Sequence, residues 1–120
     1  MTKYVEGHLR NLASGHGERL TKALEAAAAI MDHLTGWDWN DPKNVFDDAW
    51  YLDTTKIRID AFAACFDAKE SKKVLKALHD DFNRLEENAN RRDFGEVATD
   101  TALIGYHVIA AMRNATSLWI

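Results

Sequence analysis

The 120-residue chain has few of the features that place a protein outside the cytoplasm. Its only cysteine, Cys65, cannot form a disulfide within the chain, so the fold does not depend on an oxidising compartment. Because Cys65 lies between Ala64 and Phe66, we predict that it is a small core residue. No segment reaches the about 20 apolar residues that a membrane span needs, and residues 1–10 lack the apolar stretch of a secretory signal. We therefore expect a cytoplasmic protein.

The sequence also lacks an excess of basic residues. Its formal net charge is −4, which argues against a nucleic-acid-binding protein, because such proteins depend on a large basic surface. The charges are unevenly spread: a lysine cluster follows a segment that is rich in aspartate. The aspartates are Asp38, Asp41, Asp47, Asp48, Asp53 and Asp60, and the lysines are Lys69, Lys72, Lys73 and Lys76. We expect an acidic end and a basic shoulder.

Reactive motifs are missing as well. The five histidines include no pair at four-residue spacing, no His-Glu-x-x-His and no Glu-x-x-His, and no glycine-rich phosphate loop is present. We therefore predict no catalytic residue, no metal ligand and no cofactor. The alternative is a metal-dependent hydrolase, in which carboxylates and His107 or His79 would act inside the fold.

The main positive signal is helical periodicity. Four segments carry apolar residues at steps of three and four, and such residues share one face of an α-helix that must be buried. The stripes are Leu20, Leu24, Ala27, Met31, Leu34; Val45, Ala49, Leu52, Ile59, Ala63, Phe66; Val74, Leu78, Phe82, Leu85, Ala89; and Val97, Ile104, Val108, Ala111, Ala115, Leu118. The pattern predicts an all-α protein, a compact up-and-down helical bundle of four long helices plus a short N-terminal helix at about 3–13, in a single domain of residues 1–120.

Local signals predict where the long helices begin and end. A helix over about 18–35 should end at Gly36 in a left-handed conformation. Asp41 and Pro42 should start the next helix, which extends to about Phe66, although Thr54–Ile59 also has the alternation of a strand. Asp67 with Glu70, and Asp93 with Glu96, have capping-box spacing and should start the last two helices. Small residues on the helices around 26–29 and 102–115 favour close packing of these two.

Aromatic residues gather between positions 37 and 51. Three of the four tryptophans lie there, among aspartates. The third helix, counting the short N-terminal one, also carries a second apolar stripe beside the first, made of Phe46, Trp50, Ile57, Ala61 and Ala64. One interpretation is that this helix is central and that Trp37 and Trp39 close the end of the bundle. The other is that one side of the helix is left for another molecule, because aromatic anchors ringed by charges are typical of binding surfaces.

The second interpretation predicts a non-enzymatic protein-interaction module that docks on a basic partner surface through an acidic aromatic face. Small acidic inhibitors, such as immunity proteins, antitoxins and phage anti-defence proteins, share its size and charge. The predicted partner-binding residues are Trp37, Trp39, Asp47, Asp48, Trp50, Tyr51 and Asp53. A homodimer through the third or fifth helix would also cover apolar surface, and the terminal Trp119 and Ile120 could dock within one copy or on a second. A carrier with an apolar cavity between the aromatic residues is a further alternative.

Overall fold

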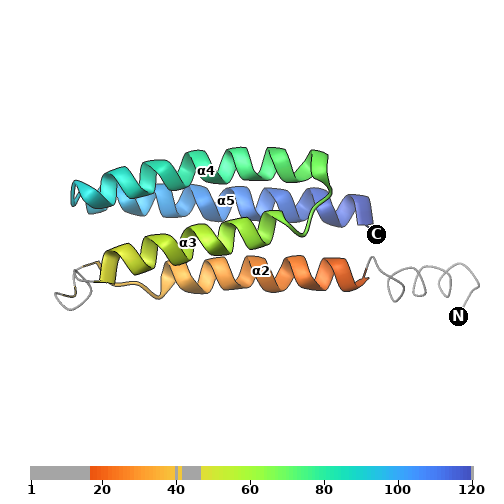
Figure 1. Cartoon of the computed structure of the whole chain (residues 1–120), viewed down its shortest axis with the longest axis horizontal. Helices are drawn as coiled ribbons and strands as arrows, with labels where there is room; N and C mark the ends of the chain where they lie inside the picture. The colour runs from red at the N-terminus through yellow and green to blue at the C-terminus, as the bar shows by residue number, and fades with distance from the viewer. Residues whose placement is uncertain (1–16, 40, 42–46, 120) are drawn as a thin grey trace, which may run out of the picture.

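The computed structural model describes residues 17–39, 41 and 47–119, with side chains as far as Ala115. It contains α2 (Gly17–Thr35), α3 (Asp48–Ala63), α4 (Ala68–Asn90) and α5 (Phe94–Trp119). The helices alternate in direction along the chain, so the predicted up-and-down bundle of four long helices is confirmed (Figure 1). The short N-terminal helix predicted at 3–13, and the side chains of Trp119 and Ile120, lie outside the described residues.

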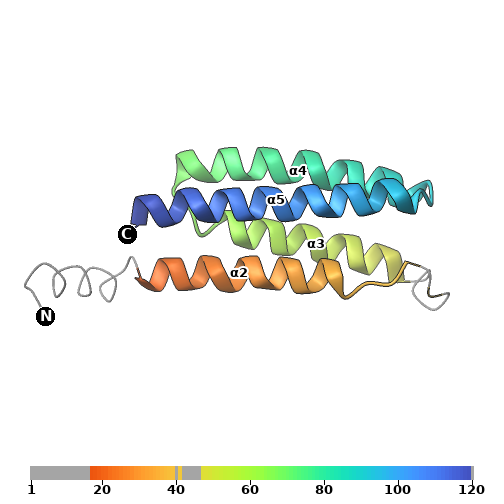
Figure 2. The same cartoon turned by 180° about the vertical axis from the view of Figure 1, so that it is seen from behind.

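The four helices form a ring in which each contacts its two neighbours. Both α2 and α4 pack against α3 and α5, as the two opposite views show (Figures 1 and 2). The predicted pairing of α2 with α5 is present, and Gly105 lies against Met31 where the helices approach closely. A Cβ atom at Gly105 would stand 3.1 Å from Met31 Cε, so the end of the Met31 side chain would have to shift by a few tenths of an ångström to admit a larger residue.

The core follows most of the predicted stripes. Its fully buried aliphatic residues include Ile30, Ile59, Leu78, Leu85 and Ile104, from all four helices. Among the stripe members that the structure describes, two are exposed instead: Leu24 at the edge of α2 and Ala49 in the first turn of α3. Each residue turns a helix by about 100°, so a stripe drifts towards solvent at its edges. Cys65 is half-buried at the rim of the core and not inside it.

The predicted starts of α4 and α5 are confirmed. The backbone N–H of Glu70 donates to Asp67 Oδ1 over 3.0 Å, and that of Glu96 donates to Asp93 Oδ1 over 3.3 Å. In both cases the aspartate satisfies a backbone donor that the first helical turn leaves free.

The bounds predicted for α3 are wrong at both ends. The helix begins at Asp48 and ends at Ala63, although Thr54–Ile59 is helical as expected. The N-cap position of α3 is occupied by Asp47 and not by Asp41, whose backbone N–H donates to Asp38 O over 3.3 Å. Residues 42–46 lie outside the described residues.

The helix-ending signal at Gly36 is also wrong in detail. Its φ lies outside the left-handed region, and its N–H donates to Asp32 O over 3.0 Å, which continues the helical pattern by one residue. The left-handed position belongs to Arg92, with φ 60°, after α4. There the Arg92 N–H donates to Ala89 O and the Asp93 N–H to Asn88 O, the pair of bonds of a Schellman motif.

The left-handed backbone conformation of Arg92 can be tested by mutation. The Arg92→Gly and Arg92→Ala variants both lose the ion pair with Asp48 and the contact of the guanidinium with the Phe94 ring. Only glycine removes the Cβ crowding of a left-handed residue, so we expect the glycine variant to be about 1 kcal/mol more stable than the alanine variant in urea unfolding. Equal stability of the two would show that the turn is not left-handed in solution.

Candidate functional site

The predicted aromatic residues come together at the end of the bundle where α2 leads into α3. The Trp37 ring stacks on Tyr51 with centroids 4.6 Å apart, and Trp39 meets the Tyr51 ring edge-on at 5.1 Å. Trp39 also stacks on Phe94 at the start of α5, with centroids 5.7 Å apart. These contacts join the α2–α3 connection to α3 and α5, so they close this end of the bundle as one of the two interpretations expects.

The aromatic residues differ in burial. Tyr51 is fully buried, and this burial raises the pKa of its phenol well above the ordinary value. Trp37 and Trp39 are half-buried, whereas Trp50 is 58% exposed. The inner edge of Trp50 contacts the rings of Trp37 and His33, with centroids 6.1 and 5.7 Å apart. Trp50 is therefore held on one side and open to solvent on the other.

The acidic residues divide in a similar way. Asp48 Oδ2 accepts from Arg92 Nη1 over 2.6 Å, so this carboxylate is already neutralised by the α4–α5 turn. Asp47 and Asp53 are exposed, and no described residue forms an ion pair with either. Asp53 lies one helical turn after Trp50 on α3, and Asp47 precedes the first turn of this helix as its N-cap residue.

A row of apolar side chains continues from Trp50 along the outside of α3. Ile57 is 67% exposed, and Ala61 and Ala64 are exposed further along the helix. Within the part of the chain that the structure describes, the second apolar stripe is thus exposed on the outside of α3. We call Asp47, Trp50, Asp53 and Ile57 the α3 face. Ile57 belongs in this site although the sequence analysis did not place it there; its membership of the second stripe was the available signal.

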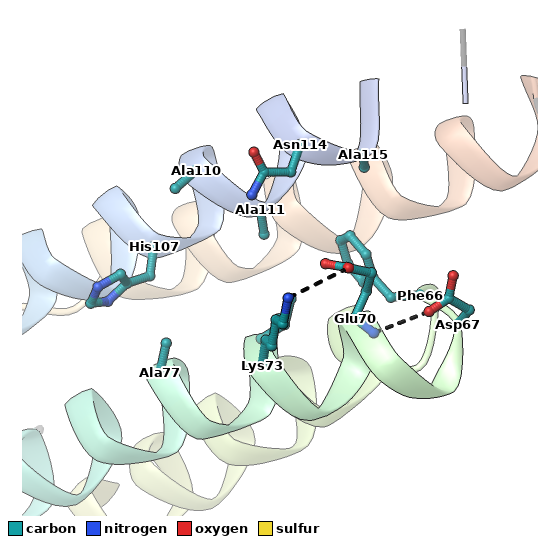
Figure 3. A pocket seen from close by; sticks show the side chains of 11 residues that line it. Phe66, Asp67, Glu70, Lys73, Ala77, His107, Ala110, Ala111, Asn114 and Ala115 are labelled. Carbon is teal, nitrogen blue, oxygen red and sulfur yellow. Dashed lines mark hydrogen bonds and ion pairs between the residues drawn. The ribbon is translucent and has the colours of Figure 1, made fainter. Parts of the chain in front are cut away.

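A separate pocket of about 420 Å³ lies between α4 and α5, at the end of the bundle opposite the aromatic residues (Figure 3). Glu70 and Lys73 reach into it from α4, and Asn114 from α5, with His107 at one end. Lys73 Nζ and a Glu70 carboxylate oxygen are 4.0 Å apart. The cavity has charged residues at its rim and lies at the other end of the bundle from Trp37, Trp39 and Trp50, so it does not match a carrier cavity between these aromatic residues.

His107 is held by a carboxylate that the sequence analysis missed. Asp81 on α4 is fully buried, and it pairs with His107 Nδ1 and with an Arg84 guanidinium nitrogen. The available signal was its position: Asp81 follows Leu78 by three residues and lies on the buried face of α4. A second polar link between α4 and α5 runs from Asn88 Nδ2 to the buried Asp100 Oδ2 over 2.7 Å.

These polar pairs connect helices and do not converge. Nowhere in the described part of the chain do three or more His, Cys, Asp or Glu side chains come close enough together to hold a metal ion. The hydrolase alternative requires such a group around His107 or His79. His79 Nε2 instead pairs with a single carboxylate, that of Asp60, over 2.8 Å.

Cys65 lies in a groove between α2 and α3, lined in part by Lys22 and Arg19. Burial raises the pKa of its thiol, and the positive charges of Lys22 and Arg19 offset only part of this rise. A raised pKa leaves less thiolate at a given pH, so alkylation by iodoacetamide near neutral pH should be several-fold slower than for an unstructured cysteine peptide. A rate equal to that of the peptide would contradict this account.

None of the described helices is both long enough and apolar enough to cross a membrane. Comparison of the chain with protein-family models, with curated proteins and with solved structures found no match.

Proposed function

We propose that the protein is a non-enzymatic interaction module that docks on a basic surface of another protein through the α3 face. The observation that carries the proposal is the exposure of Trp50 and Ile57 on a stretch of chain that also exposes the carboxylates of Asp47 and Asp53. A contiguous row of large exposed apolar side chains is typical of surfaces that bind another protein. Covering them with a partner removes apolar area from water.

The geometry of Trp50 suits an anchor residue. Tryptophan is the residue type most enriched among those that dominate binding energy. Its contacts with Trp37 and His33 restrict the free side chain before binding, so less conformational entropy is lost on association. Exposed carboxylates at the rim favour a basic partner and speed its approach.

The proposed partner is a different protein from this chain. If two α3 faces met around a two-fold axis, Asp47 and Asp53 of each copy would face those of the other, and like charges at an interface are unfavourable. Small acidic proteins that bind basic surfaces include inhibitors such as immunity proteins and antitoxins, and an inhibitor acting in the cytoplasm is the role we propose by this analogy of size and charge.

Site-specific photo-crosslinking tests the proposal. A photoreactive phenylalanine analogue in place of Ile57 should capture a partner with a basic surface from a lysate of the native host, whereas the same analogue at Glu86 on α4 should not. The Asp47→Lys, Asp53→Lys double variant should abolish capture at position 57, because it reverses the charge beside Trp50.

A matched control keeps the total charge change constant. Asp80→Lys with Glu86→Lys on exposed positions of α4 changes the net charge by the same amount and should leave capture at position 57 intact. The proposal fails if no protein is captured at position 57, or if both double variants reduce capture equally.

A further inference from the structure

The outer face of α5 carries almost no charge. Thr99, Ala102, Tyr106 and Ile109 are exposed, and the first charged residue after them on this face is Arg113. On α4 the exposed positions are mostly charged and include Lys69, Lys72, Lys76, Asp80, Arg84, Glu86 and Glu87. The two helices pack against each other and have similar lengths, so the difference marks α5 as a helix whose outer face is suited to contact with protein.

This face continues into a groove on its α2 side. The groove has a volume of about 620 Å³ and is lined chiefly by apolar side chains, among them Leu24 and Met31 from α2 and Ile109 and Met112 from α5. Leu24 and Ile109 are 52% and 57% exposed, and Tyr106 beside them is 67% exposed. We call the groove and its rim the α2–α5 face. It lies on α2 and α5 and does not include the α3 face.

The α2–α5 face has two acidic residues on its α2 rim and two hydrogen-bond donors on its α5 rim. Glu25 and Asp32, both exposed, are seven residues apart on α2, and Tyr106 and Arg113 are seven residues apart on α5. The helices are antiparallel and Met31 lies opposite Gly105, so Glu25 and Arg113 are within about 3 Å of the same height along the bundle. Asp32 and Tyr106 have the same relation. No described residue forms an ion pair with Glu25 or Arg113.

We propose that the α2–α5 face packs on a second copy of this chain around a two-fold axis parallel to the helices. In this arrangement α5 of one copy lies on α2 of the other, so Arg113 meets Glu25 of the partner subunit. The Tyr106 hydroxyl donates to Asp32 of the partner subunit. Both pairs form twice by symmetry, and the apolar groove residues are buried between them. A second copy fits because the acidic residues on α2 and the hydrogen-bond donors on α5 belong to the same face and lie at similar positions along the bundle axis.

Light scattering after size-exclusion chromatography tests this arrangement. The wild-type chain should have twice the 13.6 kDa mass at micromolar concentration. Arg113→Glu and Glu25→Arg should each weaken dimerisation at least about tenfold, because each places two like charges opposite each other twice. Combining the two reversals should restore the dimer to within a few-fold of wild type, a rescue that general destabilisation would not give.

The control is a charge placed on the other exposed apolar surface. Trp50→Asp should leave the dimer intact, and Ile109→Asp should dissociate it, with helical circular dichroism retained in both variants. A monomeric wild-type protein at all concentrations would overturn the proposal. So would a dimer that survives Ile109→Asp, or single charge reversals that the double variant does not rescue.

Discussion

Replacing His107 with leucine is expected to lower the free energy of unfolding by about 3 kcal/mol, measured by urea denaturation. The change removes one of the two partners of Asp81, a carboxylate that is fully buried between α4 and α5. Removing one partner from a buried carboxylate typically costs about 3–5 kcal/mol, because the charge stays out of water with fewer groups to stabilise it. Arg84 is half-exposed and remains beside Asp81, so the expected loss of stability lies at the lower end of this range.

Two comparisons isolate the buried charge as the cause. Adding Asp81→Leu to His107→Leu should recover most of the loss, because apolar replacement of a whole buried pair is close to neutral. His79→Leu removes the exposed partner of Asp60 and should cost less than about 1 kcal/mol. If His107→Leu cost no more than His79→Leu, then Asp81 would not be a buried carboxylate in solution.

Ile59→Ala should cost about 2–5 kcal/mol, whereas Ile57→Ala should change stability by less than about 0.5 kcal/mol. The two isoleucines lie two residues apart on α3, and truncation removes the same atoms from each. Ile59 is fully buried and leaves a cavity when shortened, whereas Ile57 is mostly exposed.

This pair of variants also separates folding from binding. Ile57→Ala should keep the fold and reduce capture of the proposed partner, because Ile57 belongs to the α3 face. Val108→Ala, a second core truncation, should also lower the free energy of unfolding, because Val108 is buried in the same core as Ile59. A larger loss from Ile57→Ala than from Ile59→Ala would mean that α3 is rotated about its axis relative to the structure.

Much of the fold could be predicted because its determinants are local. Apolar residues at steps of three and four predict four helices. Asp67 and Asp93 predict two helix starts, and both aspartates accept the expected hydrogen bonds from the first turn of the helix that follows. The start of α3 could not be predicted in this way. The residues before α3 take part in tertiary contacts, such as the stacking of Trp37 on Tyr51, that the local sequence pattern does not reveal.

The candidate site shows the same limit. Trp37, Trp39, Trp50 and Tyr51 are close in sequence, so their clustering could be predicted, but which of them reach solvent depends on how α3 is rotated in the bundle. Asp48 looks like its acidic neighbours in the sequence. Only the distant Arg92, brought alongside by the α4–α5 turn, distinguishes it from Asp47.

The affinity of the captured partner for wild-type and variant proteins, measured by titration calorimetry at low and high salt, tests the role of the α3 face most directly. We expect Trp50→Ala to weaken binding by about 30-fold or more, as loss of an anchor residue of about 2 kcal/mol would. Asp47→Lys with Asp53→Lys should weaken it by about tenfold at low salt and by less at high salt. Unchanged affinity for both variants would contradict the proposal that this protein acts through the outer face of α3.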